Sequence, residues 1–326
     1  MRKVIIIAGL LILVLGVIFI SRLIGKKPDF PNLSQEQIDM INAALDDDSK
    51  GRPIEDQFRV QIAEGDLSVT EGLDEDWLNI LLLGTDAKSG ALNEGRTDAM
   101  LVLSLHTKTG QMKLTSLIRD MLVTIPGYKI QIRVNTANAF GGPLLAIKTV
   151  NELLGLNIRR YCSINFPGFA DFVDYLGGVT LTLSPGEVRI IRVQRTDEPQ
   201  LVNGYQALTY VRIRELDNNF GRNNRQRVFL SAMLAQLKTK TTDEIIDAIS
   251  AAFNTIATNL TTSEVVALIP TIIGSEDAMD MLSLPQEGKF SYARTEQGQS
   301  VIHFRVQTLR ESFRAFISGQ GSPDTD

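Results

Sequence analysis

The sequence predicts an α/β domain, with a central mixed β-sheet flanked by helices, behind one N-terminal transmembrane helix. Three observations predict this fold class. An apolar run of seventeen residues opens the chain, three closely spaced strand patterns follow from residue 78, and helix and strand patterns alternate from residue 141 onward. The 326 residues have room for one large domain of about 240 residues and its attachments.

The composition excludes some classes of function. Hydrophobic content of 44% and charged content of 22% are ordinary for a globular protein. The formal net charge of −5, without a broad basic surface, gives no support to a nucleic-acid partner. The single cysteine, Cys162, cannot form an internal disulfide and has no CxxC partner, so we expect a buried structural thiol.

The apolar run Val4–Ile20 predicts a membrane anchor. Its seventeen residues lie at the lower edge of the range of about 17–25 that a membrane-spanning helix needs. A cleavable signal peptide is the alternative, but no small-residue A-x-A pattern follows the run, so we expect the segment to be retained. Basic residues flank both ends of the run, and charge alone therefore leaves open which side of the membrane the domain faces.

We divide the chain into an anchor segment (1–24), a stalk (25–76), a folded domain (77–318) and a disordered tail (319–326). In the stalk, a capping-box pattern from Ser34 to Gln37 predicts a short helix through Leu45. The three aspartates that follow are expected to be a solvated helix end rather than a cation site. Residues Phe58–Val69 are expected to form a strand pair.

Three strands are predicted at the start of the domain, at Leu78–Gly84, Ala99–His106 and Met112–Ile118. In an antiparallel hairpin the paired positions have a constant sum, and a turn centred on residues 108 and 109 makes that sum 217. The residue numbers of Asp98 and Arg119 also have the sum 217. We therefore expect these two residues to lie opposite each other at the open end of the hairpin.

A metal and phosphate site is predicted at this open end. If the first strand runs in the same direction as the third, Asp86 reaches the same edge. Magnesium typically takes one or two carboxylates and fills its other positions with water and phosphate oxygens, as Asp86 and Asp98 would allow. Arg119 suits bidentate contacts to phosphate. His106 and His303 lie within strand patterns and are expected to be structural.

The rest of the domain alternates between helices and strands. Gly141 and Gly142 precede a helix that has proline at its first position, and residues Glu187–Pro199 are expected to be a surface excursion. The expected helices are Pro143–Leu154, Gly168–Leu176, Asn203–Ala207, one from Gly221, Asp243–Ala257, Ser263–Ile273 and Gln307–Ile317, and the expected strands are Arg160–Phe166, Val179–Leu183, Lys289–Ala293 and Ser300–Phe304.

A basic stretch precedes and enters the helix that begins at Gly221. Within sixteen residues of this acidic protein it contains Arg212, Arg214, Arg222, Arg225 and Arg227. The first two of these arginines are expected on a strand, and the others on the helix.

The helical spacing of this stretch predicts an anion site. Arg222, Gln226, Phe229 and Met233 follow one another at i, i+4, i+7 and i+11, so they share the face that continues as an apolar interior stripe. An arginine that points inward near a helix N-terminus needs an anion, which the helix dipole also favours. The alternative for such a run is a basic helix face exposed to solvent. The inward direction predicted for Arg222 and Gln226 counts against this alternative.

Six segments occur in an order and spacing that are specific in combination, although each alone would be weak. They are NILLLGTD (79–86), GRTDAMLVL (95–103), LTSLIRDMLV (114–123), RVNTANAFGG (133–142), YCSINFPGFADFVDYLGGV (161–179) and LTYVRIRELDNNFGRNNRQR (208–227). From about Trp77 to Ile317 the chain resembles the LytR–CpsA–Psr (LCP) family of bacterial cell-envelope proteins.

This resemblance implies a phosphotransferase with an LCP-type α/β/α domain. Such an enzyme takes a glycan carried on a polyprenyl pyrophosphate, transfers the glycosyl-phosphate to a hydroxyl of peptidoglycan or another cell-wall acceptor, and releases polyprenyl phosphate. The resemblance also implies a single-pass membrane protein with a short cytoplasmic start and the domain on the extracytoplasmic side. It implies a lipid-filled apolar groove, whose lining is not evident because core and groove leucines look alike in a sequence.

The resemblance assigns roles to individual residues. Asp86 and Asp98 would hold Mg²⁺, and Asp98 and Arg119 are the expected catalytic residues. The general base stays open between Asp98 and a carboxylate near Asp217. The expected pyrophosphate-binding residues are Arg119, Arg133, Arg212, Arg214, Arg222, Arg225 and Gln226.

Three positions depart from the family pattern. Arg133 replaces a usual lysine, which keeps the charge but changes the geometry. Asn165 and Asn219 stand where an aspartate is usual. These two amides keep two alternatives open: a non-catalytic polyprenyl-phosphate-binding or regulatory membrane protein, and a lipid pyrophosphate hydrolase with water as the acceptor.

Overall fold

The computed structural model describes the greater part of the predicted domain. It covers residues 59–86, 93–128, 131–194, 198–213, 216, 219–237, 256–261, 264, 279–295 and 298–319. Within these ranges, no helix has the length and apolar character needed to cross a membrane. The expected anchor, the expected Ser34 helix and nearly all of the expected helices between residues 243 and 273 lie outside the described residues.

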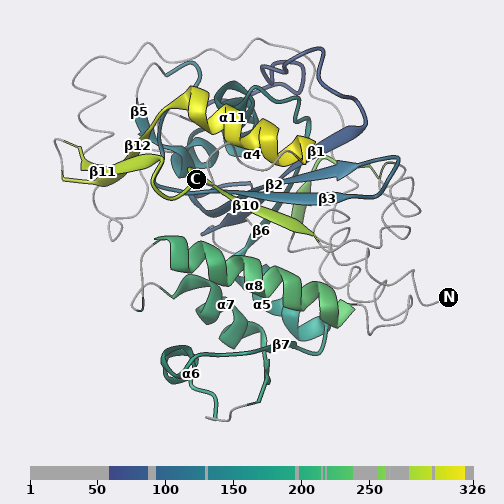
Figure 1. Ribbon diagram of the computed structural model, residues 1–326, viewed down its shortest axis with the longest axis vertical. Helices are drawn as coiled ribbons and strands as arrows, with labels where there is room; N and C mark the ends of the chain where they lie inside the picture. Colours follow the sequence, from purple (N-terminus) through teal and green to yellow (C-terminus); the bar gives the residue numbers. More distant parts are fainter. Residues whose placement is uncertain are drawn as a thin grey trace.

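A six-stranded mixed sheet forms the centre of the described structure (Figure 1). Its strands are β1 (Trp77–Thr85), β2 (Thr97–His106), β3 (Met112–Leu117), β6 (Arg160–Asn165), β9 (Ile256–Thr258) and β10 (Asp280–Leu284). In the order β10-β3-β2-β1-β6-β9, the antiparallel β1–β2–β3 meander is extended by β6 parallel to β1 and by β10 parallel to β3. The predicted mixed sheet is therefore confirmed.

The β2–β3 hairpin has the predicted register. Leu101 pairs with Ser116 and Leu105 pairs with Met112, and both pairs have the sum 217. Because β1 and β3 both run antiparallel to β2, they share one direction. This is the condition under which Asp86 reaches the same edge as the open end of the hairpin.

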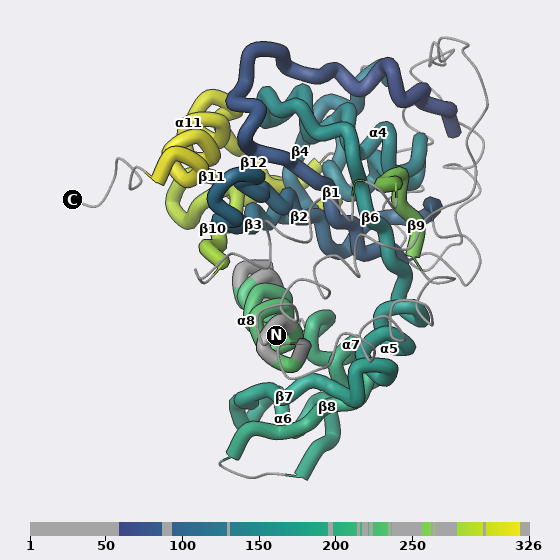
Figure 2. The backbone as a smooth tube through the Cα atoms, turned by 90° about the vertical axis from the view of Figure 1, so that its right-hand side faces the viewer, coloured from purple at the N-terminus to yellow at the C-terminus, as the bar shows by residue number. Residues whose placement is uncertain are grey.

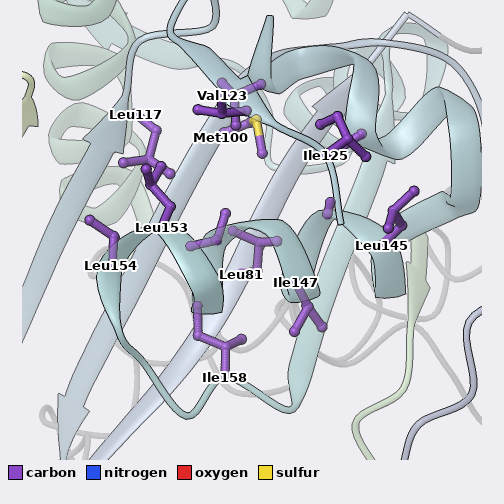
Figure 3. Packing of buried hydrophobic residues seen from close by; sticks show 14 of the residues in the cluster. Leu81, Met100, Leu117, Val123, Ile125, Leu145, Ile147, Leu153, Leu154 and Ile158 are labelled. Atoms are coloured by element: carbon purple, nitrogen blue, oxygen red, sulfur yellow. The ribbon is translucent and has the colours of Figure 1, made fainter. Parts of the chain in front are cut away.

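Helices cover both faces of the sheet (Figures 1 and 2). One face carries α4 (Ala137–Leu154) and α11 (Val306–Ser318), and the other faces α5 (Phe166–Tyr175), α7 (Gly204–Arg212) and α8 (Asn219–Leu237). Successive residues of β1 point to opposite faces, so the apolar run supplies two hydrophobic clusters. Figure 3 shows part of the α4 side, with Leu81, Met100 and Ile147 in one cluster.

A small lobe extends from the α5–α7–α8 side (Figure 2). In it, β7 (Val179–Leu181) pairs with β8 (Gln200–Val202), and α6 (Pro185–Ile191) lies between them in the sequence. The expectation of a surface excursion from Glu187 is wrong for its first residues, because Ser184 and Glu187 form a capping box that begins α6. This Ser-Pro-Gly-Glu pattern was a readable signal in the sequence.

Several short strands escaped prediction. β4 (Leu122–Thr124) pairs with β5 (Gln131–Arg133), and a 3₁₀ turn, η1 (Val134–Thr136), leads from β5 into α4. β10 was missed, and β9 begins where the end of a helix was expected at residues 256 and 257. Strands of three to five residues are too short to show the alternation of apolar and polar residues by which a strand is predicted. The expected hairpin of β11 (Phe290–Arg294) and β12 (Ser300–Phe304) is present.

Residues 59–76 pack onto the domain. Val60 N donates to Phe140 O at 2.8 Å and Thr70 N donates to Leu156 O at 2.8 Å, while the side chain of Leu67 is buried. The strand pair expected at residues 58–69 is wrong over the described part, because this segment forms no strand and takes its hydrogen bonds from α4 and the turn after it. The folded unit therefore includes residues that precede Trp77.

Two further expectations hold. The helix from Pro143 to Leu154 is present and ends at Gly155 in the left-handed conformation, but α4 also has an extra turn before Gly141 and Gly142, where the helical backbone is interrupted. Cys162 is 1% exposed, and burial raises the pKa of its thiol, as expected for a structural cysteine.

Candidate functional site

The ends of three strands meet at one edge of the sheet. Thr85 at the end of β1 pairs with Thr97 at the start of β2 and with Asn165 at the end of β6. Asp86 follows directly, and its backbone N–H donates to Arg96 O at 3.0 Å. Arg96, which directly precedes β2, was not predicted as a site residue.

Asp98 and Arg119 form an ion pair at this edge. Arg119 Nη1 lies 2.5 Å from Asp98 Oδ1, and the two side chains are only 14% and 18% exposed. The structure thus brings together the residues that the hairpin register placed opposite each other. A pair this close, and largely removed from water, fixes the plane of the guanidinium.

Asp120 and Arg133 extend the pair into a row of alternating charges. Asp120 is 6% exposed, and its Oδ1 lies 3.4 Å from Arg119 Nε and 3.6 Å from Arg133 Nε. Arg133 Nε also donates to Ser300 O at 3.0 Å, which ties the row to β12. Asp120 was not predicted from the sequence, because its contacts depend on how the chain turns after β3 and on β12, far away in the sequence.

An apolar cavity opens beside this edge, between the sheet and the helices α5, α7 and α8. Its empty volume is about 820 Å³ including its mouth. Strand residues Leu82, Leu83, Gly84, Ala99, Leu101 and Ile164 line it, together with helix residues Phe166, Phe169, Phe172, Leu208, Val211, Phe229, Leu230 and Met233. Most of these residues were indistinguishable from core positions in the sequence.

Four polar residues complete the lining: Asp98, Asn165, Arg212 and Gln226. The guanidinium of Arg212 lies 4.1 Å from the ring centroid of Phe166, a cation–π contact at the cavity wall. Arg212 is the last residue of α7, so its expected place on a strand is wrong. The capping box of Asn203 and Gln206 begins α7, which continues to Arg212, beyond the expected end at Ala207.

Local sequence features hold the cavity walls in place. Asn165 is the N-cap of α5, where its Oδ1 accepts the Gly168 N–H at 2.9 Å. Gly204 lets α7 approach α5 closely, because a Cβ at that position would lie 2.0 Å from Ala170 O. The Gly204 N–H also donates to Asp174 Oδ1 at 2.7 Å.

Arg225 points into the protein rather than to the cavity. It is 4% exposed, its Nη2 donates to Ile213 O at 2.8 Å, and its Nη1 lies 3.7 Å from Glu187 Oε1. Nearby, burial raises the pKa of Tyr210 to about 12, with a smaller contribution from Glu187. Arg225 therefore ties α8 to α6 and to the end of α7, which is not the place expected for a pyrophosphate ligand.

The structure describes only some of the remaining predicted residues. Arg214 lies outside the described residues, as does Asp217. Arg222 lies in the first turns of α8, on the same helix as Gln226, Phe229 and Met233. The buried Gln226, Phe229 and Met233 confirm the inward face predicted for this helix.

The carboxylates at the edge suit only some metals. No group of three or more histidine, cysteine, aspartate or glutamate side chains able to hold a metal occurs among the residues described. Two carboxylates, Asp86 and Asp98, lie at the same edge. This donor set fits Mg²⁺, which completes its shell with water and substrate phosphate oxygens, better than zinc, whose structural sites usually have four protein ligands.

An apolar cavity whose lining also includes Arg212 and Asp98 has the shape and chemistry that suit a long apolar molecule with an anionic head group. The sequence profile of the LytR_cpsA_psr family matches residues 35–314. Because this match spans most of the chain, the protein belongs to that family, as the sequence motifs predicted.

Individual relatives agree with the assignment. The polyisoprenyl-teichoic acid–peptidoglycan teichoic acid transferase TagU of Oceanobacillus iheyensis is 32% identical over 232 residues, which cover 66% of this chain and 69% of that protein. Biofilm regulatory protein A of Streptococcus mutans is 33% identical over 225 residues, which cover 63% of this chain and 55% of that protein. This chain thus spans little more than half the length of the second relative.

A solved structure shares the fold. TagT of Bacillus subtilis with bound octaprenyl pyrophosphate lipid has a TM-score of 0.61 and 26% sequence identity, with 81% of this chain and 100% of that chain covered.

Proposed function

We propose that this protein is a glycopolymer–peptidoglycan phosphotransferase. It takes a glycan linked to polyprenyl pyrophosphate, transfers the glycosyl-phosphate to a cell-wall hydroxyl, and releases polyprenyl phosphate. The transferase name of the Oceanobacillus relative and the octaprenyl pyrophosphate bound to TagT support this function. The observation that carries it is the continuity of the apolar cavity with the charged edge at Asp98 and Arg212.

The cavity suits a prenyl tail. Its wall consists of aliphatic and aromatic side chains of the sheet, α5, α7 and α8, while its polar residues are few. Apolar surface of a lipid gains about 25 cal/mol for each Å² that leaves water, so binding of the tail itself needs no specific polar contacts and places the pyrophosphate at the mouth. Gln226 and Arg212 then lie where the tail ends and the charged head begins.

The reaction exchanges one phosphorus–oxygen bond for another. The acceptor hydroxyl oxygen attacks the phosphorus that carries the sugar, and the bond from this phosphorus to the bridging oxygen breaks. Polyprenyl phosphate leaves with the electron pair, and the hydroxyl proton passes to a base at the site. In such a transfer the protein contributes mainly positioning and charge stabilisation, which the guanidinium of Arg119 supplies beside Asp98.

Magnesium belongs to this proposal. Asp86 and Asp98 would hold the ion, together with water and pyrophosphate oxygens, and the bound ion would neutralise charge on those oxygens. The Nη1 of Arg119 already contacts Asp98 Oδ1, so the same carboxylate orients the arginine that faces the phosphate. Arg133 and Arg212 complete the proposed head-group site, with Arg222 and Arg214 as further candidates from the family pattern.

The amide at position 165 is compatible with activity. Asn165 Oδ1 caps α5, and asparagine and aspartate are about equally good N-cap residues. The exchange of a carboxylate for an amide at this position therefore keeps the helix start that forms one wall of the cavity. It also removes a negative charge from the neighbourhood of an anionic head group.

We also propose that Val4–Ile20 anchors the chain in the membrane, with the catalytic domain on the extracytoplasmic side. Both substrates support this arrangement. A prenyl lipid is delivered from a bilayer, and peptidoglycan lies outside it.

The test is a product analysis. The full chain in detergent micelles is incubated with a lipid-linked oligosaccharide pyrophosphate, Mg²⁺ and peptidoglycan fragments, and the products are followed by mass. We expect a phosphodiester-linked conjugate together with polyprenyl phosphate. Lipid phosphate without conjugate would instead support the hydrolase. Unchanged lipid would support a lipid-binding regulatory protein, the second candidate, which is favoured by the name of the Streptococcus relative.

A further inference from the structure

A second hollow is lined by residues of α8, of β10 and of β7 with the residue that follows it. Helix α8 lies between β7 and β10 in the fold (Figure 1). The hollow is an open groove with an empty volume of about 860 Å³. The groove is lined by Thr180, Leu181, Thr182, Asn224, Arg227, Val228, Ser231, Ala232 and Met281. None of these residues belongs to the site described above.

The groove and the apolar cavity use opposite faces of one helix. Gln226, Phe229 and Met233 face the cavity, whereas Asn224, Val228 and Ser231 face the groove. At about 100° per residue, the mean directions of the two sets differ by roughly 180°. Helix α8 is therefore a wall shared by the two hollows, and a molecule in the groove lies about one helix diameter, roughly 10–12 Å, from the cavity.

Arg227 is the charged residue of the groove. Its half-buried guanidinium makes two long contacts to one residue, from Nε to Met281 Sδ at 3.5 Å and from Nη2 to Met281 O at 3.4 Å. No carboxylate of the described residues forms an ion pair with it. Burial lowers the pKa of Arg227, since partial removal from water opposes the charged form. An anion in the groove would compensate this loss of hydration.

The other polar groups of the groove suit a hydroxyl-rich ligand. The side chains of Thr180, Thr182, Asn224 and Ser231 are exposed and make no hydrogen bond to another described residue. They present three hydroxyl groups and one amide, which both donate and accept. Val228 and Met281 add apolar surface that can cover the face of a sugar ring.

We propose that this groove is a binding site for an anionic, hydroxyl-rich saccharide or polyol chain, which it holds while the lipid pyrophosphate occupies the cavity. This inference rests on the proposed transferase function and assigns the saccharide portion of its substrates to a place on the protein. The required chemistry occurs in a phosphate-bearing donor polymer and in a carboxylate-bearing peptidoglycan fragment. The test distinguishes the two sources.

The test measures binding without catalysis. Full chain in detergent micelles is titrated with either of two soluble probes, a muropeptide or an oligomer of glycerol phosphate, and binding is followed by saturation-transfer NMR of the probe. Arg227→Gln removes the charge, and Ser231→Trp fills the groove from an exposed helix position. Arg189→Gln, at an exposed position of α6 outside the groove, is the charge-matched control.

We expect Arg227→Gln to weaken binding of one probe by about tenfold or more, as the loss of a charge-assisted hydrogen bond implies, with Arg189→Gln unchanged. Ser231→Trp should weaken the same probe. Loss of muropeptide binding assigns the groove to the acceptor, and loss of glycerol-phosphate binding assigns it to the donor polymer. Equal affinity of both groove variants and the wild type for both probes overturns the proposal. Probe binding in a chain that lacks transfer activity would leave the groove standing while the transferase function fails.

Discussion

Replacement of Arg119 by lysine tests the chemistry of the sheet edge most directly. In the structure, two different nitrogens of this arginine face two carboxylates: Nη1 lies 2.5 Å from Asp98 Oδ1, and Nε lies 3.4 Å from Asp120 Oδ1. A lysine keeps the positive charge but has a single nitrogen. It is a point charge without the separated nitrogens that reach Asp98 and Asp120 in the native protein, and it lacks the planar fork that suits phosphate.

The expected loss follows from the contacts. The Arg119 side chain is 14% exposed, so solvent screens its interactions only weakly. A hydrogen bond to a charged group contributes about 1.5–3 kcal/mol. At about 1.4 kcal/mol per tenfold change in rate, loss of one such bond from the guanidinium to the pyrophosphate in the transition state lowers kcat/KM by about 10- to 100-fold.

The assay is the rate of conjugate formation from a lipid-linked pyrophosphate at fixed Mg²⁺, with thermal unfolding measured in parallel. Arg160→Lys is the matched control, because Arg160 also uses two nitrogens, Nε at 2.7 Å and Nη2 at 2.5 Å, on the carboxylate of Glu264. Arg160 begins β6 and lies at the opposite edge of the sheet from Asn165. The reasoning fails if Arg119→Lys retains near-normal kcat/KM, or if Arg160→Lys loses as much activity.

Three further predictions concern the metal, the cavity and the thiol. Asp98→Ala should abolish transfer and flatten its dependence on Mg²⁺ concentration while thermal unfolding stays cooperative; full activity would refute the metal assignment. Leu230→Trp should block the cavity and displace a fluorescent prenyl phosphate at a modest cost in stability, about 1–3 kcal/mol, and unchanged lipid affinity would show that the tail binds elsewhere. Cys162 should resist iodoacetamide in the native state and react after denaturation, because its thiol is buried and its pKa is raised; rapid native alkylation would contradict this.

The parts of the site that follow from local register were predictable. A tight turn fixes which residues of a hairpin oppose each other, so Asp98 and Arg119 could be paired from their positions alone. Asp120 could not be placed in this way. Its partner Arg133 is the last residue of β5, in a separate two-stranded ribbon, and Ser300 belongs to β12, more than 160 residues further along the chain than Arg133.

The cavity was not predictable for a different reason. Leu101 and Phe229 line it, yet both are as apolar and as buried as residues of the true core. A periodic pattern of hydrophobic residues predicts that a side chain is buried. It does not predict whether that side chain packs against other protein atoms or lines a cavity. The strands and helices could therefore be predicted, whereas the gap between them could not.

The arginines of the basic stretch do not all point the same way. Consecutive residues of a helix point about 100° apart, so Arg225 and Arg227 differ by about 200° and point to nearly opposite sides of α8. The structure gives them separate partners: Arg225 contacts Ile213 and Glu187 in the interior, and Arg227 lies in the polar groove beside Met281. Gln226 lies between them in the sequence and faces the apolar cavity. Three successive residues of α8, Arg225, Gln226 and Arg227, thus face the protein interior, the apolar cavity and the groove, so the arginines of the stretch are divided among different surroundings.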